Sequence, residues 1–308
     1  MKRWSDLVRN PWMLAPMAGY TDAPFRKLCS RFGAGLTVTE MVSAKALTLG
    51  NRNTLALLQK LPEEGPCAVQ LFGSDPQIFR EAVRHEAVQK FDSIDLNMGC
   101  PVQKVFRNGE GSALMQTPEK AARIVEAVKS ATEKPVSVKF RLGVDASREN
   151  CVEFGIACAE AGADALTVHG RTRTQMYSGK ASFEKVAQLV QAVRIPVYAN
   201  GDVTSLQEAR LLQQRTGAYG VAVGRGALGR PWLFREASEP PEVWPLLKEQ
   251  MEDSLALFGE HYALNALKRH AAFYCKGIPG GKKQLVRLYA CKTLEDGLRE
   301  LQEFWRVK

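Results

Sequence analysis

Long apolar segments are missing from this sequence of 308 residues. No run reaches the roughly 18 consecutive apolar residues that a membrane-spanning helix needs, so we expect no contact with a membrane. The start, MKRWSDLVRNPW, lacks the apolar stretch and the small-residue cleavage site of a secretory signal. These two absences predict a cytoplasmic protein.

Cysteine pairs with metal-binding spacing are absent too. The seven cysteines include no CxxC motif, and the sequence therefore predicts no metal site. In a reducing compartment they are expected to be free thiols, most of them buried. The net charge of +9 is compatible with a polyanionic partner, although many soluble proteins are equally basic.

Short β-branched runs alternate with longer segments of helical periodicity. Eight such runs predict an α/β fold, a closed (β/α)8 TIM barrel, with an open doubly wound sheet as the alternative. The expected strands cover residues 12–16, 36–40, 67–71, 93–97, 136–140, 165–169, 196–200 and 220–224.

Three of the intervening helices carry recognisable end signals. A capping side chain followed by proline indicates a helix start, as does a serine with glutamate three residues later. A terminal glycine indicates a helix end. The predicted signals are Asp75 with Pro76 in DPQIFREAVRHEAV, Thr117 with Pro118, and Ser205 with Glu208 in a helix ending at Gly217.

The pattern changes at REASEPPEVWP, residues 235–245, where three prolines indicate a linker. Beyond it, apolar residues such as Leu247 and Met251 recur at helical spacing, and no convincing strand follows. We predict a barrel domain over residues 1–238 and a small all-helical domain over 241–308.

Polar residues recur where the expected strands end, and in such a barrel these ends share one rim. Lys139 lies among apolar neighbours in VSVKFRL, and a buried ammonium needs a partner, which favours a functional role. His169 could be a core histidine, but its place at a strand end favours function. Gln70 and Asn200 fit a functional role and simple strand-end capping equally well.

The segment GRGALG, residues 224–229, fits the GxGxxG pattern of dinucleotide-binding folds. We reject that interpretation, because Pro231 follows and no further βαβ unit remains before the linker. Glycines after the seventh and eighth strands instead suit a barrel phosphate site, to which Arg225 would add a charged contact. Tight turns are the alternative explanation for these glycines.

A phosphorylated ligand bound there could extend across the barrel mouth to Lys139 and Gln70. Flavin mononucleotide has a suitable shape, and a lysine would stabilise the negative charge that its reduced ring carries near N1 and O2. The spacing alone does not distinguish a flavin from a sugar phosphate.

Seven motifs carry a resemblance to a known family: APMAGYTDAPFR, VQLFGSDP, DLNMGCP, VKFRLG, HGRT, ANGDV and GRGALGRPWLF. In this order they resemble the tRNA-dihydrouridine synthases, closest to the bacterial B-type, from about residue 11 to 235. The resemblance implies an FMN-containing barrel with a helical C-terminal domain. It also implies NADPH-driven reduction of the C5–C6 double bond of particular tRNA uridines, in the D-loop.

The resemblance further implies roles for individual residues. Cys100 in NMGCP would be the proton donor, and Asn97 would touch the uracil. Lys139 or Arg141 could stabilise the oxygen that gains negative charge. The implied cofactor contacts are Pro16, Met17, Ala18, Gln70, Lys139, His169, Asn200, Gly201, Asp202, Gly224 and Arg225.

The implied chemistry explains why residue 100 is a cysteine. Hydride transfer to C6 of the uracil builds negative charge at C5 and the C4 carbonyl, so a proton must reach C5. With an ordinary pKa near 8.5, a thiol is roughly 97% protonated at pH 7 and is still acidic. A carboxylic acid would be mostly ionised, and a serine hydroxyl would be far too weak an acid. A buried free cysteine is the alternative, which a place at a barrel rim disfavours.

Acidic residues are missing from the segment 261–294, which contains seven Lys and Arg. A uracil stacked in folded tRNA must be flipped out, which requires a second surface to hold the RNA. Lys283 and Arg287 form a like-charge pair that RNA phosphates could neutralise, whereas a solvated helix face is the alternative. The predicted RNA-binding residues are Lys268, Arg269, Lys282, Lys283 and Arg287.

Three other functions remain open. A small-molecule flavin oxidoreductase of the dihydroorotate dehydrogenase type would share the barrel and would not need the basic segment. A non-catalytic RNA-binding barrel would not need Cys100, and a sugar-phosphate lyase or isomerase would purify colourless. The reduced uridine, a ribosomal RNA substrate, and NADPH against NADH are undetermined by sequence. We expect a monomer without an obligate protein partner.

Overall fold

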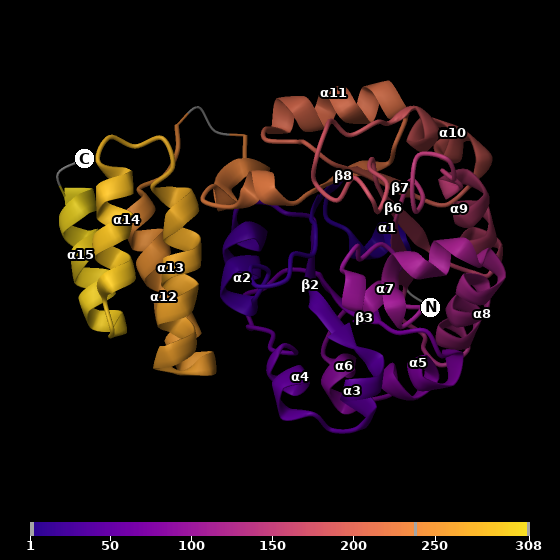
Figure 1. The fold of residues 1–308 in the computed structure, drawn as a ribbon, viewed down its shortest axis with the longest axis horizontal. Helices are drawn as coiled ribbons and strands as arrows, with labels where there is room; N and C mark the ends of the chain where they lie inside the picture. Colours follow the sequence, from indigo (N-terminus) through magenta and orange to yellow (C-terminus); the bar gives the residue numbers. More distant parts are fainter. Residues whose placement is uncertain (1–2, 237–238, 307–308) are drawn as a thin grey trace.

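The computed structural model describes residues 3–236 and 239–306 and shows a closed barrel of eight parallel strands. The strands follow one another in chain order, and β1 closes the barrel by pairing with β8 (Figure 1). This closure confirms the predicted (β/α)8 barrel and excludes the open sheet. The strands are β1 (Trp12–Leu14), β2 (Leu36–Ser43), β3 (Cys67–Phe72), β4 (Ser93–Asn97), β5 (Val136–Arg141), β6 (Ala165–His169), β7 (Val197–Asn200) and β8 (Gly220–Val223).

Helices connect the strands and cover the outside of the barrel (Figure 1). Buried apolar side chains of these helices pack on the outward-facing side chains of the strands in one continuous core. The α-helices are α1 (Trp4–Leu7), α2 (Ala23–Arg31), α3 (Ala44–Thr48), α4 (Arg52–Ala56), α5 (Pro76–Ala82), α6 (Glu86–Gln89), α7 (Gln103–Arg107), α8 (Pro118–Lys129), α9 (Cys151–Glu160), α10 (Glu184–Ala192) and α11 (Leu206–Thr216). The 3-10 helices are η1 (Gly111–Gln116), η2 (Arg225–Ala227) and η3 (Pro231–Phe234).

The predicted helix starts are correct in position but not in every detail. Asp75 accepts a hydrogen bond from the backbone N–H of Gln77 and caps α5. The prediction of a single helix after Asp75 is wrong. The chain turns after α5, and a second helix, α6, begins behind the capping residue His85. Thr117 precedes α8 but makes no side-chain cap bond, so only its proline signal operates.

The ends of α11 follow the prediction with one change. Ser205 accepts a hydrogen bond from the Glu208 N–H, as in a capping box. The Glu208 carboxylate, however, binds the backbone N–H of Thr204 rather than that of Ser205. Gly217 ends the helix in the left-handed region, with φ of 66°.

Gly217 offers a test of this helix end. We expect Gly217→Ala to lower the free energy of unfolding by about 1 kcal/mol, because alanine disfavours positive φ. An added Cβ would lie 3.7 Å from the Val190 side chain, an ordinary contact, so the cost is conformational. Gly217→Asn is the matched control and should lose less, since asparagine tolerates this conformation. Equal losses in urea unfolding of both variants would contradict this explanation.

The barrel interior is apolar at its amino-terminal end. Trp4 and Leu7 of α1 pack there against inward-facing strand residues such as Met13 and Ala222. The Trp4 indole donates a hydrogen bond of 3.0 Å to the Tyr198 hydroxyl inside the barrel. Among the described residues, α1 therefore covers the amino-terminal end of the barrel.

Residues 239–306 form four helices that stand beside α2 at the edge of the barrel (Figure 1). They enclose an apolar core of their own, which includes Leu247 and Met251. A helical tail was predicted, but the predicted boundary at residue 238 lies outside the described residues. No helix in the described ranges combines the length and apolarity that crossing a membrane requires. The helices are α12 (Val243–Phe258), α13 (Glu260–Tyr274), α14 (Gly281–Ala290) and α15 (Leu294–Arg306).

Charged and polar contacts join the tail to the first βα unit of the barrel. Lys27 of α2 forms ion pairs with Glu249 and Asp253 of α12, at 3.0 and 2.5 Å. On α13, the Tyr262 hydroxyl donates to the buried Asp22 carboxylate at 3.0 Å. Arg269 donates to the Gly19 carbonyl at 3.0 Å. The tail is therefore fastened to the loop that follows β1.

The buried Asp22 carboxyl should make stability depend on pH. Burial raises the pKa of Asp22 to about 6, so the folded state holds this proton more tightly than the unfolded chain. The contribution to stability is present at pH 4 and is lost as pH rises through about 6. Asp22→Asn removes this titrating group, and the Oδ1 atom of the asparagine can still accept the Phe25 N–H that caps α2.

We expect the unfolding free energy of Asp22→Asn relative to the wild type to rise by about 2 kcal/mol between pH 4.5 and 7. Thermal unfolding across that range measures the difference. Asp75→Asn, at an exposed helix cap, is the matched control and should follow the wild-type profile. Parallel profiles for Asp22→Asn and the wild type would contradict the prediction.

Candidate active site

The strand register brings polar side chains together inside the upper half of the barrel. Gln70 of β3, Asp95 of β4 and Ser137 of β5 are direct neighbours across the sheet. Two residues further along, Asn97 of β4 pairs with Lys139 of β5. Because alternate strand residues face the same side, both rows point into the barrel above its apolar floor.

A chain of hydrogen bonds links the first row to the loop that carries Cys100. Ser137 donates to Asp95 at 2.5 Å, and the Gln70 amide donates to the other Asp95 oxygen at 2.6 Å. The Asn97 amide donates to Gln70 Oε1 at 2.8 Å. Asn97 Oδ1 then accepts the backbone N–H of Cys100 at 2.9 Å. The chain thus runs from the barrel interior to the backbone of the cysteine.

Asp95 is a site residue that sequence analysis missed. It is buried, and burial raises its pKa to about 6, whereas the bonds from Gln70 and Ser137 favour the charged form. A carboxylate at an inward position of the apolar run SIDLN was the available signal, because a buried charge needs partners.

Cys100 lies at the mouth with 8% of its surface exposed. Ser112 donates its hydroxyl to the Cys100 carbonyl at 2.8 Å, and Asn97 holds the Cys100 N–H from the other side. Burial raises the pKa of the thiol, although a hydrogen bond from the Val102 backbone and the charges of Arg141 and Lys139 oppose the shift. The thiol therefore stays protonated at neutral pH, as a proton donor requires.

The other cysteines fit the expectation of free thiols. The structure shows no disulfide among the described cysteines, and all of these except Cys291 are buried. No group of three or more His, Cys, Asp or Glu within residues 3–236 and 239–306 could hold a metal ion.

Arg141 acts on the backbone of two loops at the mouth. Its Nε donates to the Gly99 carbonyl at 2.8 Å, next to Cys100. Its Nη1 donates to the carbonyls of Thr172 and Met176, each at 3.0 Å. The predicted contact of Arg141 with the substrate stays a prediction. Its three hydrogen bonds connect the loop that carries Cys100 to the loop after β6.

Lys139 is half-buried and has no hydrogen-bond partner for its ammonium within the described residues. Burial, together with the Arg141 charge, lowers the pKa of Lys139 to about 8. It therefore remains mostly protonated at pH 7. An unpaired cation at this depth is available to an electron-rich ligand.

His169 ends β6 and is 8% exposed. Burial and four surrounding cations, of which Lys139 and Arg141 have the larger effects, lower its pKa to about 2. The imidazole is thus neutral at physiological pH. It can exchange hydrogen bonds with a ligand without adding charge.

Past β7, the backbone adopts positive φ at Gly201 (142°) and Asp202 (51°). Asp202 accepts hydrogen bonds from Arg171 and from the Ala181 N–H, and it pairs with Arg225 at 3.7 Å. Asn200 donates to the Ala222 carbonyl at 2.7 Å, which ties β7 to β8. These predicted ligand residues form one rim segment of the mouth.

Tyr177, also missed by sequence analysis, stands at the same rim. It is 54% exposed, and the guanidinium of Arg225 lies 4.9 Å from its ring centre. Arg141 lies 5.9 Å from that ring centre on another approach. Met176, which precedes Tyr177, has a φ of 50° in the left-handed region.

The predicted residues after β1 lie next to the Arg225 end of this rim, because β1 pairs with β8. Pro16 and Met17 are half-buried and Ala18 is exposed. The loop is held by a hydrogen bond of 2.5 Å from the Gly19 N–H to Glu40 and by Arg269 of the tail. Gly224 approaches Met17, because a Cβ there would lie 3.6 Å from its sulfur.

The basic residues of the tail divide into two groups. Lys282, Lys283 and Arg287 are exposed on α14. Lys268 instead donates to the backbone carbonyls of Tyr289 and Cys291, at 3.2 and 2.7 Å. Arg269 donates to the Gly19 carbonyl in the loop after β1. Lys268 and Arg269 therefore both bind backbone carbonyls of this chain. Their contact with RNA stays a prediction.

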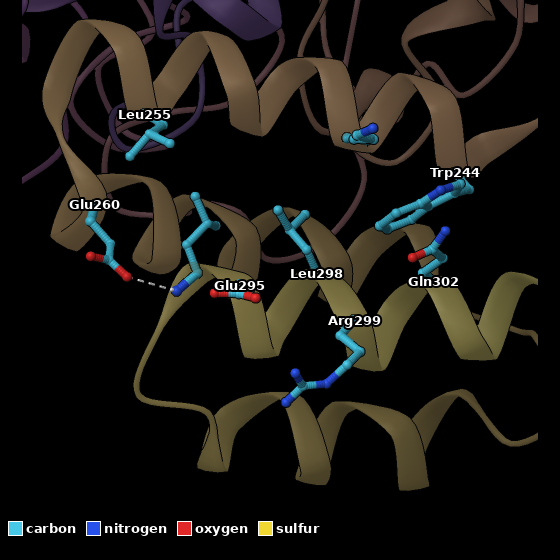
Figure 2. Close-up of a pocket in the computed structure, with 9 residues that line it drawn as sticks. Trp244, Leu255, Glu260, Glu295, Leu298, Arg299 and Gln302 are labelled. Carbon is cyan, nitrogen blue, oxygen red and sulfur yellow. Dashed lines mark hydrogen bonds between the residues drawn. The ribbon is translucent and has the colours of Figure 1, made fainter.

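A cleft of about 580 Å³ opens between the tail helices and is lined by residues between Trp244 and Gln302. Figure 2 shows Trp244 and Leu255 on one side of it and Leu298 and Arg299 on the other. No predicted site residue lines it. The chemistry of the mouth does not extend to this cleft.

Comparison with known proteins identifies similar sequences and a similar fold. A sequence model for dihydrouridine synthase matches residues 13–306. The tRNA-dihydrouridine synthase B of Pseudomonas aeruginosa is 39% identical over 89% of this chain and 86% of its own length. The protein of the same name from Pseudomonas putida is 36% identical, over 97% of this chain and 92% of its own. A variant of NCR from Zymomonas mobilis has a similar fold, with a TM-score of 0.54, 14% identity, and coverage of 75% of this chain and 87% of that chain.

Proposed function

This chain belongs to the dihydrouridine synthase family, oxidoreductases that reduce uridine to 5,6-dihydrouridine, and we propose that its substrate is a uridine in the D-loop of tRNA. We further propose FMN as the cofactor, NADPH as the reductant and Cys100 as the proton donor. A cytoplasmic reaction is part of the proposal.

One observation carries the proposal: a protonated thiol and an unpaired ammonium share the mouth of the barrel. Cys100 is kept neutral by burial, and Lys139 stays cationic without a partner among the described residues. A proton donor beside a fixed positive charge is what reduction of a uracil double bond requires.

A flavin suits the residues at this mouth. Its ring would meet Lys139, Gln70 and the loop Pro16–Ala18, and its phosphate would meet Gly224 and Arg225. When bound and reduced, the flavin supplies hydride for the uracil ring. Membership of this family implies a flavin, and the half-buried Lys139, whose ammonium has no hydrogen-bond partner within the described residues, supports its assignment to this mouth.

The remaining steps belong to side chains of this chain. Lys139 would stabilise negative charge on the uracil oxygen, because its donors are free within the described residues, whereas Nε and Nη1 of Arg141 already donate to backbone carbonyls. Cys100 would then give its proton to C5. The loop around Cys100 is anchored at Asn97 and Ser112, so the thiol needs little reordering before transfer.

The tail would hold the RNA while the uracil enters the mouth. Base flipping costs unstacking free energy, which contacts elsewhere on the RNA must offset. The exposed Lys282, Lys283 and Arg287 on α14 offer three cations for phosphates.

Mass spectrometry tests the function directly. Unmodified tRNA transcripts are incubated with the protein, FMN and NADPH, and nuclease fragments are weighed for a gain of two hydrogens at uridine. We expect a gain confined to D-loop fragments. No gain, on transcripts and on native tRNA from a strain lacking the enzyme, would overturn the proposal of tRNA as substrate.

A further inference from the structure

We propose that Asp95 is a positioning residue that fixes the orientation of the Gln70 and Asn97 amides and thereby the place of the Cys100 loop. The inference rests on the proposed role of Cys100 as proton donor. It concerns a residue two layers below the thiol that touches neither Cys100 nor the RNA.

Asp95, Gln70 and Asn97 differ in what they can donate and accept. An ionised carboxylate only accepts hydrogen bonds, whereas an amide has one donating and one accepting end. Asp95 lies 2.6 Å from the Gln70 amide, so the donating end of Gln70 must face it. The accepting end of Gln70 then faces Asn97, whose amide nitrogen lies 2.8 Å away.

Asn97 transmits this polarity to the cysteine loop. With its nitrogen facing Gln70, its oxygen points to the backbone N–H groups of Gly99 and Cys100, at 3.2 and 2.9 Å. If the Asn97 amide were reversed, its nitrogen would face the N–H groups of Gly99 and Cys100, and its oxygen would face Gln70 Oε1. These N–H groups would then be unpaired, at a cost in free energy. One carboxylate therefore decides three successive hydrogen-bonding links.

The surroundings leave Asp95 and Gln70 little freedom. Asp95 is 3% exposed and Gln70 is 1% exposed, so water does not compete for these bonds. The Gln70 backbone N–H is fixed by Thr39 Oγ1 at 2.9 Å. Ser137 occupies the second Asp95 oxygen. The direction of the chain is thus set by the carboxylate and not by solvent.

The test uses the full-length, flavin-bound protein and the alkylation rate of Cys100 by iodoacetamide, read on its peptide by mass spectrometry. In Asp95→Asn, the new amide can present either end to Gln70, so the direction is no longer fixed. We expect Cys100 to react about threefold faster, because its loop loses a firm anchor. Buried Cys67 and Cys158 serve as internal references and should keep their rates.

A rescue variant separates direction from general damage. When Asp95→Asn is combined with Gln70→Glu, the carboxylate is at position 70 and only accepts hydrogen bonds. The nitrogen of the Asn97 amide must then face position 70, as in the wild type. We expect the Cys100 rate to return to the wild-type value, whereas a merely structural defect would worsen with a second substitution. Ser137→Ala, which leaves the Asp95 carboxylate in place, should also react at the wild-type rate.

Either of two results would overturn the inference: a wild-type rate in folded Asp95→Asn, or a faster rate in the double variant. If Asp95→Asn does not fold, the double variant alone decides, and it must match the wild type. Because alkylation needs no RNA, these results stay readable even if tRNA is not the substrate. Loss of uridine reduction with intact alkylation behaviour would count against the proposed function alone.

Discussion

Cys100→Ala should lower the single-turnover rate of uridine reduction by about 1,000-fold, within the range that a general acid contributes. The thiol is the neutral acid at the mouth, and burial keeps it protonated. Alanine removes the proton without adding bulk. Rapid-quench measurements with the reduced, flavin-loaded protein and saturating tRNA would give the rate.

The control for this variant is Cys291→Ala. Cys291 is half-buried at the end of α14, outside the mouth, and its removal should leave the rate unchanged. Affinity for tRNA should stay within about twofold in both variants, because the thiol contacts no phosphate in the proposal. Reduction at the wild-type rate by Cys100→Ala would remove Cys100 as the donor. An absence of reduction in the wild type as well would favour an RNA-binding protein or a small-molecule reductase.

Replacing Lys282, Lys283 and Arg287 together by glutamine should weaken tRNA binding by about 100-fold at physiological salt. Each phosphate that a cation neutralises adds about 0.9 to the slope of log affinity against log salt concentration. Three lost contacts should therefore reduce that slope by about 2.7. Filter binding or anisotropy between 50 and 300 mM salt measures both quantities.

A matched variant replaces Arg84, Arg123 and Arg194, three exposed cations near the outer helices of the barrel, by glutamine. It removes the same total charge, so it controls for long-range attraction. We expect it to change affinity by less than threefold, with a nearly unchanged salt slope. Equal losses in the two variants would show that overall charge, and not α14, holds the RNA.

The barrel was predictable because its signals are local and repeat eight times. Each expected strand has the right place, since a β-branched run followed by a capped helix leaves little choice of topology. Strand-end residues such as Lys139 and His169 followed from the barrel itself. The helix expected after Asp75 failed because sequence periodicity does not show where the chain must turn to cover the barrel.

Pairing between strands could not be predicted, and it decides the details of the site. The role of Asp95 depends on its neighbours in β3 and β5, which only the register identifies. Arg269 and Lys268 looked alike in a basic run, yet each binds backbone carbonyls that the local sequence does not indicate. Charge counting finds a basic surface but does not say which of its cations are already engaged.

The hydrogen bond between Arg269 and Gly19 joins residues 250 positions apart and therefore has a consequence for synthesis on the ribosome. At 5 to 20 residues per second, the loop after β1 waits roughly 10 to 50 s before its partner has been made. Closure of the barrel waits similarly, because β1 pairs with β8. The first βα unit emerges long before the segments that cover it, so we expect it to be the part of the nascent chain that chaperones protect longest.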